Sequence, residues 1–247
     1  MFRDNELNLG FSEQDTQKVL GVLSRLIPHV VQENLVIVGG ITRRHHLMRH
    51  GIPYPQRPFN DLDFMIRDRS EMKPSITSEF LLAHYHLPRD TSFFAGLVDP
   101  QTKVTIDVFD YYHAPIDLEE VEIGGFQLKI RGSEDQLTKT VYDLMKITKG
   151  YPLNPKEFDS ADQLLEIVDL EKTERIWRMK YTFLYPFSIM EAIQRAKDER
   201  RRYPERVFEF PSRTTEPFNC LECTEVPGFT LTPKKEIIKL LGYVDKT

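Results

Sequence analysis

The sequence contains no apolar run that approaches the roughly 18 residues needed to cross a bilayer. Its first residues do not combine a basic segment with an apolar one, so we expect neither a membrane span nor a secretory signal. Only two cysteines occur in 247 residues, which favours a reducing compartment such as the cytoplasm. Basic residues do not outnumber acidic ones, and a net charge of −5 argues against non-specific coating of nucleic acid.

Hydrophobic residues make up 40% of the chain, which is enough for a buried core and too much for a disordered protein. The pattern changes near residue 132. Strand-like and helix-like segments are mixed over 1–132, whereas 133–247 is mainly helical. We therefore predict an α+β protein in which domain 1–132 is a short mixed β-sheet flanked by helices and domain 133–247 is mainly helical.

Periodicity and turn residues predict the individual elements. The expected strands span 35–40, 61–66 and 103–112, and a hairpin over 121–130 turns at Gly124-Gly125. The expected helices span 12–32, 41–50, 74–86, 133–149, 160–170, 187–202 and 233–241. Ser12 is the predicted cap of the first helix and Thr232 that of the last, and three prolines predict a loop over 52–60.

Acidic residues recur within two of these strands. Asp61 and Asp63 are two residues apart, so both carboxylates project from one face while Leu62 and Phe64 face a core. Asp107 alternates with apolar residues in the third strand, and a neighbouring strand would place it beside the other two. Like charges this close need a compensating cation, and Mg²⁺ prefers such oxygen ligands. The pattern predicts a site for two Mg²⁺ ions, with Mn²⁺ as a substitute.

A double glycine lies where the first strand passes into a helix. Gly39 and Gly40 would let the backbone approach a ligand, and free N–H groups at the start of a helix suit phosphate. Thr42 would add a hydroxyl, and Arg43 would contribute to a cationic wall beside the phosphates.

The order GG, then NDLDFMI, then TIDVF resembles the polymerase-β-type nucleotidyltransferase superfamily over about residues 35–110. The resemblance implies the nucleotidyltransferase fold. It implies that Gly39 and Gly40 hold the phosphates of the nucleotide, and that Asp61 and Asp63 bind two Mg²⁺. It also implies that Asp107 binds one ion and helps to activate the acceptor hydroxyl.

The segments SEDQLTKTVYDLMK and PKEFDSADQLLEI resemble the bacterial abortive-infection AbiEii toxin group of nucleotidyltransferases. This resemblance assigns Lys139 to nucleotide phosphate, with Lys146 as a substitute, and Asp159 to the wall of the site. A toxin–antitoxin role with a cognate antitoxin as a partner is consistent with this resemblance, and whether the protein is a toxin, an antidote or a housekeeping enzyme stays open.

We predict a Mg²⁺-dependent nucleotidyltransferase that moves an NMP from an NTP such as ATP to a hydroxyl and releases pyrophosphate. The acceptor would be a tRNA, a protein or a small molecule. The alternatives are a non-catalytic nucleotide-binding or regulatory module of the same fold and a metal-dependent phosphohydrolase. The base, the acceptor and the oligomeric state stay open.

Two further motifs have open interpretations. Cys220 and Cys223 form a C-x-x-C pair, which is either two unlinked thiols, an intermolecular zinc site or a redox pair. The basic cluster over 195–206 is either a solvated helix face or a contact for an RNA backbone.

Overall fold

The computed structural model describes residues 10–54, 59–86, 93–110, 114–209, 223 and 228–242. Its strands are β1 (Val36–Val38), β2 (Asp61–Met65), β3 (Leu81–Tyr85), β4 (Phe93–Val98), β5 (Thr105–Phe109), β6 (Leu118–Ile123) and β7 (Phe126–Arg131). Its α-helices are α1 (Glu13–Leu26), α2 (Gly39–Arg49), α3 (Ser133–Leu144), α4 (Pro155–Leu165), α5 (Leu170–Tyr181), α6 (Ile189–Arg202) and α7 (Lys234–Leu241). Short 3-10 turns connect several of them.

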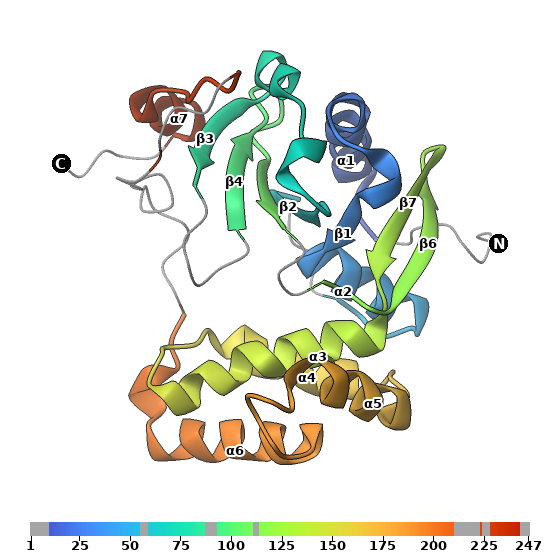
Figure 1. Ribbon diagram of the computed structural model, residues 1–247, viewed down its shortest axis with the longest axis vertical. Coiled ribbons are helices and arrows are strands. Elements are labelled where there is room, and N and C mark those ends of the chain that lie inside the picture. Colours follow the sequence, from blue (N-terminus) through green and yellow to red (C-terminus); the bar gives the residue numbers. More distant parts are fainter. Residues whose placement is uncertain are drawn as a thin grey trace.

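In the described residues the strands form one sheet in the order β3-β4-β5-β2-β1-β7-β6. The pairs β1–β7 and β2–β5 are parallel and the other pairs are antiparallel, so the sheet is mixed. Figure 1 shows helix α3 crossing near the lower ends of the strands, with α4, α5 and α6 on its far side. The predicted α+β class, a mixed sheet flanked by helices and followed by a mainly helical region, is confirmed.

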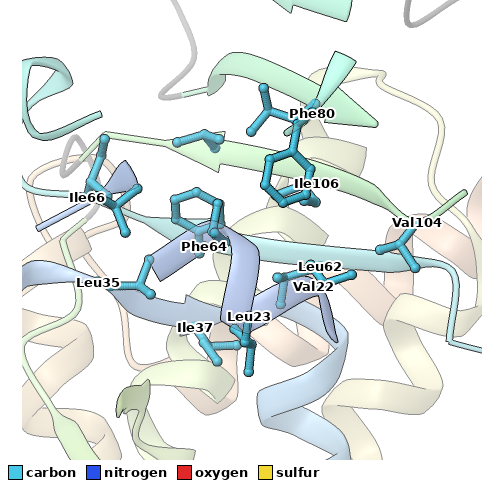
Figure 2. Packing of buried hydrophobic residues seen from close by; sticks show 14 of the residues in the cluster. Val22, Leu23, Leu35, Ile37, Leu62, Phe64, Ile66, Phe80, Val104 and Ile106 are labelled. Carbon is cyan, nitrogen blue, oxygen red and sulfur yellow. The ribbon is translucent and has the colours of Figure 1, made fainter. Parts of the chain in front are cut away.

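The main apolar core lies between α1 and the sheet. Val22 and Leu23 of α1 pack with Leu62 and Phe64 of β2, and with Ile106 of β5, as Figure 2 shows. Alternation along β2 and β5 sends these apolar side chains to one face of the sheet. The polar residues between them therefore project from the opposite face.

A second apolar cluster joins the C-terminal helices. Leu137 and Val141 of α3 pack with Phe158 of α4, Trp177 of α5 and Ile193 of α6, and all five are buried. The first cluster draws its residues from 19–130, and this one from 137–196. The predicted domain boundary at 132/133 stays a prediction.

Several local predictions are confirmed. The Ser12 side chain caps α1 by accepting a hydrogen bond from the Asp15 backbone N–H. The hairpin β6–β7 turns at Gly124 and Gly125, which have φ of +55° and +85°, a conformation that glycine adopts without strain. The first predicted strand ends early, because Gly39 already begins α2.

The helix predicted over 74–86 is wrong. A short 3-10 turn spans Pro74–Ser78, and Leu81–Tyr85 forms β3. Apolar residues spaced four apart, such as Ile76 and Phe80, imitate a helix, but pairing with β4 places the following residues in the sheet.

Two predictions in the C-terminal region also differ from the structure. The single helix expected over 160–170 is replaced by α4 and α5, whose caps are Asn154 and Asp169. Thr232 does not cap α7, since Pro233 occupies the N-cap position and the Thr232 N–H donates to the Leu82 carbonyl of β3 instead. Residues 55–58 of the predicted loop and 111–112 of the predicted third strand lie outside the described residues.

Among the residues that the structure describes, no helix has the length and apolar content that crossing a bilayer requires.

Candidate active site

The structure brings Asp63 and Asp107 together. Strands β2 and β5 run parallel, with Asp63 in register with Asp107 and Asp61 in register with Thr105. Paired residues on neighbouring strands point to the same face, and so do residues two apart on one strand. All three aspartates therefore project from the face opposite the apolar core. Asp61 is exposed, whereas Asp63 and Asp107 are half-buried.

Gly39 contacts Asp63 directly. Its φ is +74°, and a Cβ atom at this position would lie 2.9 Å from Cγ of Asp63 and closer still to Oδ2. Glycine is required here both by the left-handed backbone and by the close approach. Gly40 differs, because no atom lies within 4 Å of the position that its Cβ would take. The two glycines therefore have different surroundings: Gly39 packs against the Asp63 carboxylate, whereas open space surrounds Gly40 in the first turn of α2.

Thr42 is fully buried between α2 and α3. Its Oγ1 lies 2.9 Å from the Gly39 carbonyl oxygen and 3.2 Å from Oε1 of Gln136. These contacts tie the start of α2 to helix α3. In this conformation the Thr42 hydroxyl holds the glycine turn in place, and its predicted contact with a nucleotide stays a prediction.

The two arginines that follow have different surroundings. Arg43 is half-buried, and its Nη2 donates to the Tyr54 hydroxyl at 3.1 Å. Arg44 is buried, with its guanidinium 4.3 Å from the centre of the Phe11 ring and its Nη2 donating to the Gly10 carbonyl at 2.9 Å. Burial lowers the pKa of Arg44 from its ordinary value. Arg44 is thus a packing residue, which leaves Arg43 as the arginine of the predicted cationic wall.

Lys139 and Lys146 share one carboxylate. Lys139 forms an ion pair with Asp143, and Lys146 Nζ lies 2.8 Å from Asp143 Oδ1. Burial lowers the pKa of Lys139, while Asp143 acts in the opposite direction. Lys139 lies one helical turn beyond Gln136, the residue that contacts Thr42. The structure therefore places Lys139 on the helix that contacts the glycine turn, with its ammonium held by Asp143.

Asp159 lies on α4 and is exposed. Helix α4 packs against α3 and, over a smaller area, against α2. The predicted place of Asp159 in the wall of the site stays a prediction.

His84 is a candidate site residue that sequence reasoning missed. It is in register with Gly96 of β4, and Gly96 is in register with Asp107 of β5. Its side chain therefore points to the same face as Asp107, with a glycine between them. Burial lowers the pKa of His84, while the His86 carbonyl and the Asp107 charge act in the opposite direction. Only the pairing of β3 with β4 reveals this alignment.

Cys223 lies beside His84. Its Sγ is 3.2 Å from His84 Nδ1, and His84 Nε2 lies 3.1 Å from the His86 carbonyl oxygen. Because a carbonyl only accepts, Nε2 carries the proton and Nδ1 accepts from the thiol. Cys220, the other half of the C-x-x-C pair, lies outside the described residues.

The basic cluster over 195–206 is largely balanced by acids. Lys197 pairs with Asp162, and Arg201 pairs with Asp198. A cavity of about 380 Å³ lies beside helix α6 and is lined by Tyr185, Arg195 and other residues of the helical region. The three aspartates do not line it.

The donor set on β2 and β5 fits a hard divalent cation. It consists of carboxylates from two adjacent strands, and the Asp63 carboxylate lies against Gly39 at the start of α2. Carboxylate oxygens suit Mg²⁺ or Mn²⁺, which keep several waters and leave coordination positions for phosphate oxygens.

No protein-family profile matches the chain, and a search of curated proteins gives no match. Two solved structures are similar to it in the arrangement of their elements. One is an antigenic nucleotidyltransferase-like protein from Paracoccidioides brasiliensis, with 14% identity, a TM-score of 0.45 and coverage of 79% of this chain and 93% of that chain. The other is the antibiotic-resistance factor ANT(2'')-Ia, with 16% identity, a TM-score of 0.47 and coverage of 69% and 96%. Similarities of this extent do not bear on the chemistry of the site.

Proposed function

We propose that the chain is a Mg²⁺-dependent nucleotidyltransferase that transfers an NMP from an NTP such as ATP to an acceptor hydroxyl. The observation that supports this most directly is the row formed by Gly39, Asp63 and Asp107. A left-handed glycine at the start of a helix lies against one carboxylate, and that carboxylate is in register with another on the next strand. The row combines a metal-binding face with a backbone turn that suits phosphate.

Asp61, Asp63 and Asp107 would hold the metal ions. When bound, Mg²⁺ neutralises the charge of the phosphates and stabilises charge on the attacking and leaving oxygens. Gly40, which has open space where a side chain would be, allows phosphate oxygens to approach the first turn of α2. Arg43 and Lys139 would supply positive charge near the phosphates, and Asp159 would form part of the wall.

In the reaction, the acceptor oxygen forms a bond to the α-phosphorus of the NTP. The bond between this phosphorus and the bridging oxygen breaks, and pyrophosphate leaves with both electrons. Asp107 accepts the proton of the attacking hydroxyl and passes it to solvent. Thr42 and Gln136 do not react; they hold the glycine turn on which the geometry of Asp63 depends.

We place the enzyme in the cytoplasm. A tRNA end, a protein side chain and a small molecule all offer the required hydroxyl. The basic residues over 195–206 are largely paired with acids, which argues against a broad nucleic-acid surface there. A role as a toxin with a cognate antitoxin rests on the sequence resemblance alone.

The test is to incubate the purified protein with each labelled NTP, Mg²⁺ and a cell extract, and to measure pyrophosphate release and transfer of label. We expect one NTP to label one class of acceptor, and expect Asp61→Ala and Asp63→Ala to abolish both signals. Asp68→Ala, an exposed aspartate outside the sheet, is the matched control. Nucleotide binding without any transfer would instead support the non-catalytic module, and free phosphate as the product would support a phosphohydrolase.

A further inference from the structure

A group of two histidines and a carboxylate involves the C-terminal half of α2, away from the glycine turn. His45 and His46 are 2% and 1% exposed, and both come close to Glu119 on strand β6. One ligand atom from each of the three residues lies within 4.8 Å of the other two. Two imidazoles and a carboxylate form a donor set different from the three aspartates.

The hydrogen bond of His46 determines which nitrogen faces Glu119. His46 Nε2 lies 2.8 Å from the Arg131 carbonyl oxygen, which can only accept, so Nε2 carries the hydrogen. The other nitrogen, Nδ1, faces Glu119 Oε1 at 3.8 Å. In a neutral imidazole Nδ1 has a lone pair, so two hydrogen-bond acceptors, His46 Nδ1 and the negatively charged Glu119 carboxylate, face each other. A cation between the two atoms would bind to both and make this arrangement favourable.

A proton meets this need poorly. The separation of 3.8 Å between His46 Nδ1 and Glu119 Oε1 exceeds the length of a charge-assisted hydrogen bond, roughly 2.7–2.9 Å. Arg49 does not fill the space, because its Nη1 donates to the other carboxylate oxygen, Oε2, at 2.8 Å.

We propose that His45, His46 and Glu119 bind one zinc-class divalent cation, at a site separate from the aspartates. Two ligand atoms of a tetrahedral Zn²⁺ lie roughly 3.3 Å apart, given metal–ligand distances of about 2.0–2.2 Å. The ligand atoms of the present group, which lie within 4.8 Å of one another, reach that spacing when they close by up to about 1.5 Å. Imidazole nitrogens favour Zn²⁺ over Mg²⁺, so the two sites take different ions.

The surroundings match those of metal-bound histidines. Donation of the second ring N–H to a backbone carbonyl orients the imidazole and raises its basicity, as the Arg131 carbonyl does for His46. The Glu119 side chain is 31% exposed, which leaves a path for the ion and room for a water as fourth ligand. The bound ion would join α2, whose first residue is Gly39, to strand β6. It would therefore fix the helix that carries the glycine turn, and the proposal does not depend on catalysis.

The test is zinc binding by the full chain, treated with chelator and then titrated with Zn²⁺ by calorimetry and with Co²⁺ by visible absorption. Excess Mg²⁺ is present throughout to occupy the carboxylate site. We expect one ion per chain and tetrahedral Co²⁺ absorption. His46→Gln and Glu119→Gln should each weaken binding by at least about 10-fold. Glu120→Gln, an exposed neighbour on the opposite face of β6, should bind as the wild type does.

The variant Arg49→Gln distinguishes a metal site from a network of ion pairs among the same residues. Arg49 is half-exposed, so its replacement is expected to leave the fold intact. It removes a cation that competes for Glu119, and it should therefore tighten zinc binding by several-fold. The proposal is overturned if zinc binding is not saturable, if Arg49→Gln abolishes it, or if it is unchanged in both His46→Gln and Glu119→Gln. The last result would place the zinc elsewhere, for example at Cys223 and His84.

Discussion

Replacing Gly39 by alanine tests whether the two glycines that begin α2 have different roles. Alanine at φ +74° costs roughly 1–2 kcal/mol, because its Cβ crowds the following carbonyl. Its Cβ would also lie 2.9 Å from Asp63 Cγ, an overlap that costs about 1–3 kcal/mol to relieve. The sum is about 2–5 kcal/mol. For a chain of this size we expect a fall in melting temperature of roughly 4–20 °C.

The effect on the site is more specific than the effect on stability. The overlap is relieved most easily by movement of the Asp63 carboxylate, and a displacement of about 1 Å takes this proposed Mg²⁺ ligand out of position and costs on the order of 100-fold in rate. Gly39→Ala should therefore lose Mg²⁺-dependent nucleotide binding even at temperatures where it is folded.

Gly40→Ala is the matched control for the backbone. Its Cβ meets no atom within 4 Å, and alanine is the better helix former. We expect Gly40→Ala to melt at the wild-type temperature or above it. The reasoning is refuted if Gly39→Ala and Gly40→Ala have the same melting temperature and the same affinity for Mg²⁺.

Three further changes follow from single contacts. Thr42→Val leaves Gln136 Oε1 without its buried partner and should cost about 1–3 kcal/mol in urea unfolding; a cost equal to that of an exposed substitution would contradict it. Burial raises the pKa of Asp143, but its two lysine partners outweigh this effect and lower the pKa from 3.8. The ionised Asp143 carboxylate therefore stabilises the folded protein above about pH 4, and this stabilisation is lost as the pH falls through the lowered pKa. In thermal melts below pH 4, the melting temperature of Asp143→Asn should fall less than that of the wild type. An equal fall in both proteins would argue against a stabilising role for the Asp143 carboxylate. Because the His84 side chain lies on the same face of the sheet as Asp107, His84→Gln should reduce turnover at least about 10-fold with nucleotide affinity intact, and equal turnover would remove His84 from the site.

Local chemistry in the sequence predicts the centre of the candidate site. The β-branched run before Gly39 predicts a strand that ends in a turn, and the spacing of Asp61 and Asp63 predicts their shared face. Alternation around Asp107 predicts its orientation. Each of these signals acts over a few residues, so it is visible without knowledge of the tertiary structure.

Contacts between distant segments are what the sequence does not reveal. The alignment of His84 with Asp107 depends on β3 pairing with β4, in a segment whose apolar spacing predicts a helix. The approach of Gly39 to Asp63 depends on the register of β1 and β2. The closeness of Glu119 to His46 depends on the packing of α2 beside β6.

The most direct test of the account is calorimetric titration of the wild type, Asp63→Asn and Asp107→Asn with each NTP in the presence and absence of Mg²⁺. The account predicts that the wild type binds at least one NTP only with Mg²⁺. It predicts that both variants lose this binding while they melt at the wild-type temperature or above it, because each removes a like charge from the pair. Failure of the wild type to bind any Mg²⁺–NTP, or binding by both variants with wild-type affinity, would contradict it.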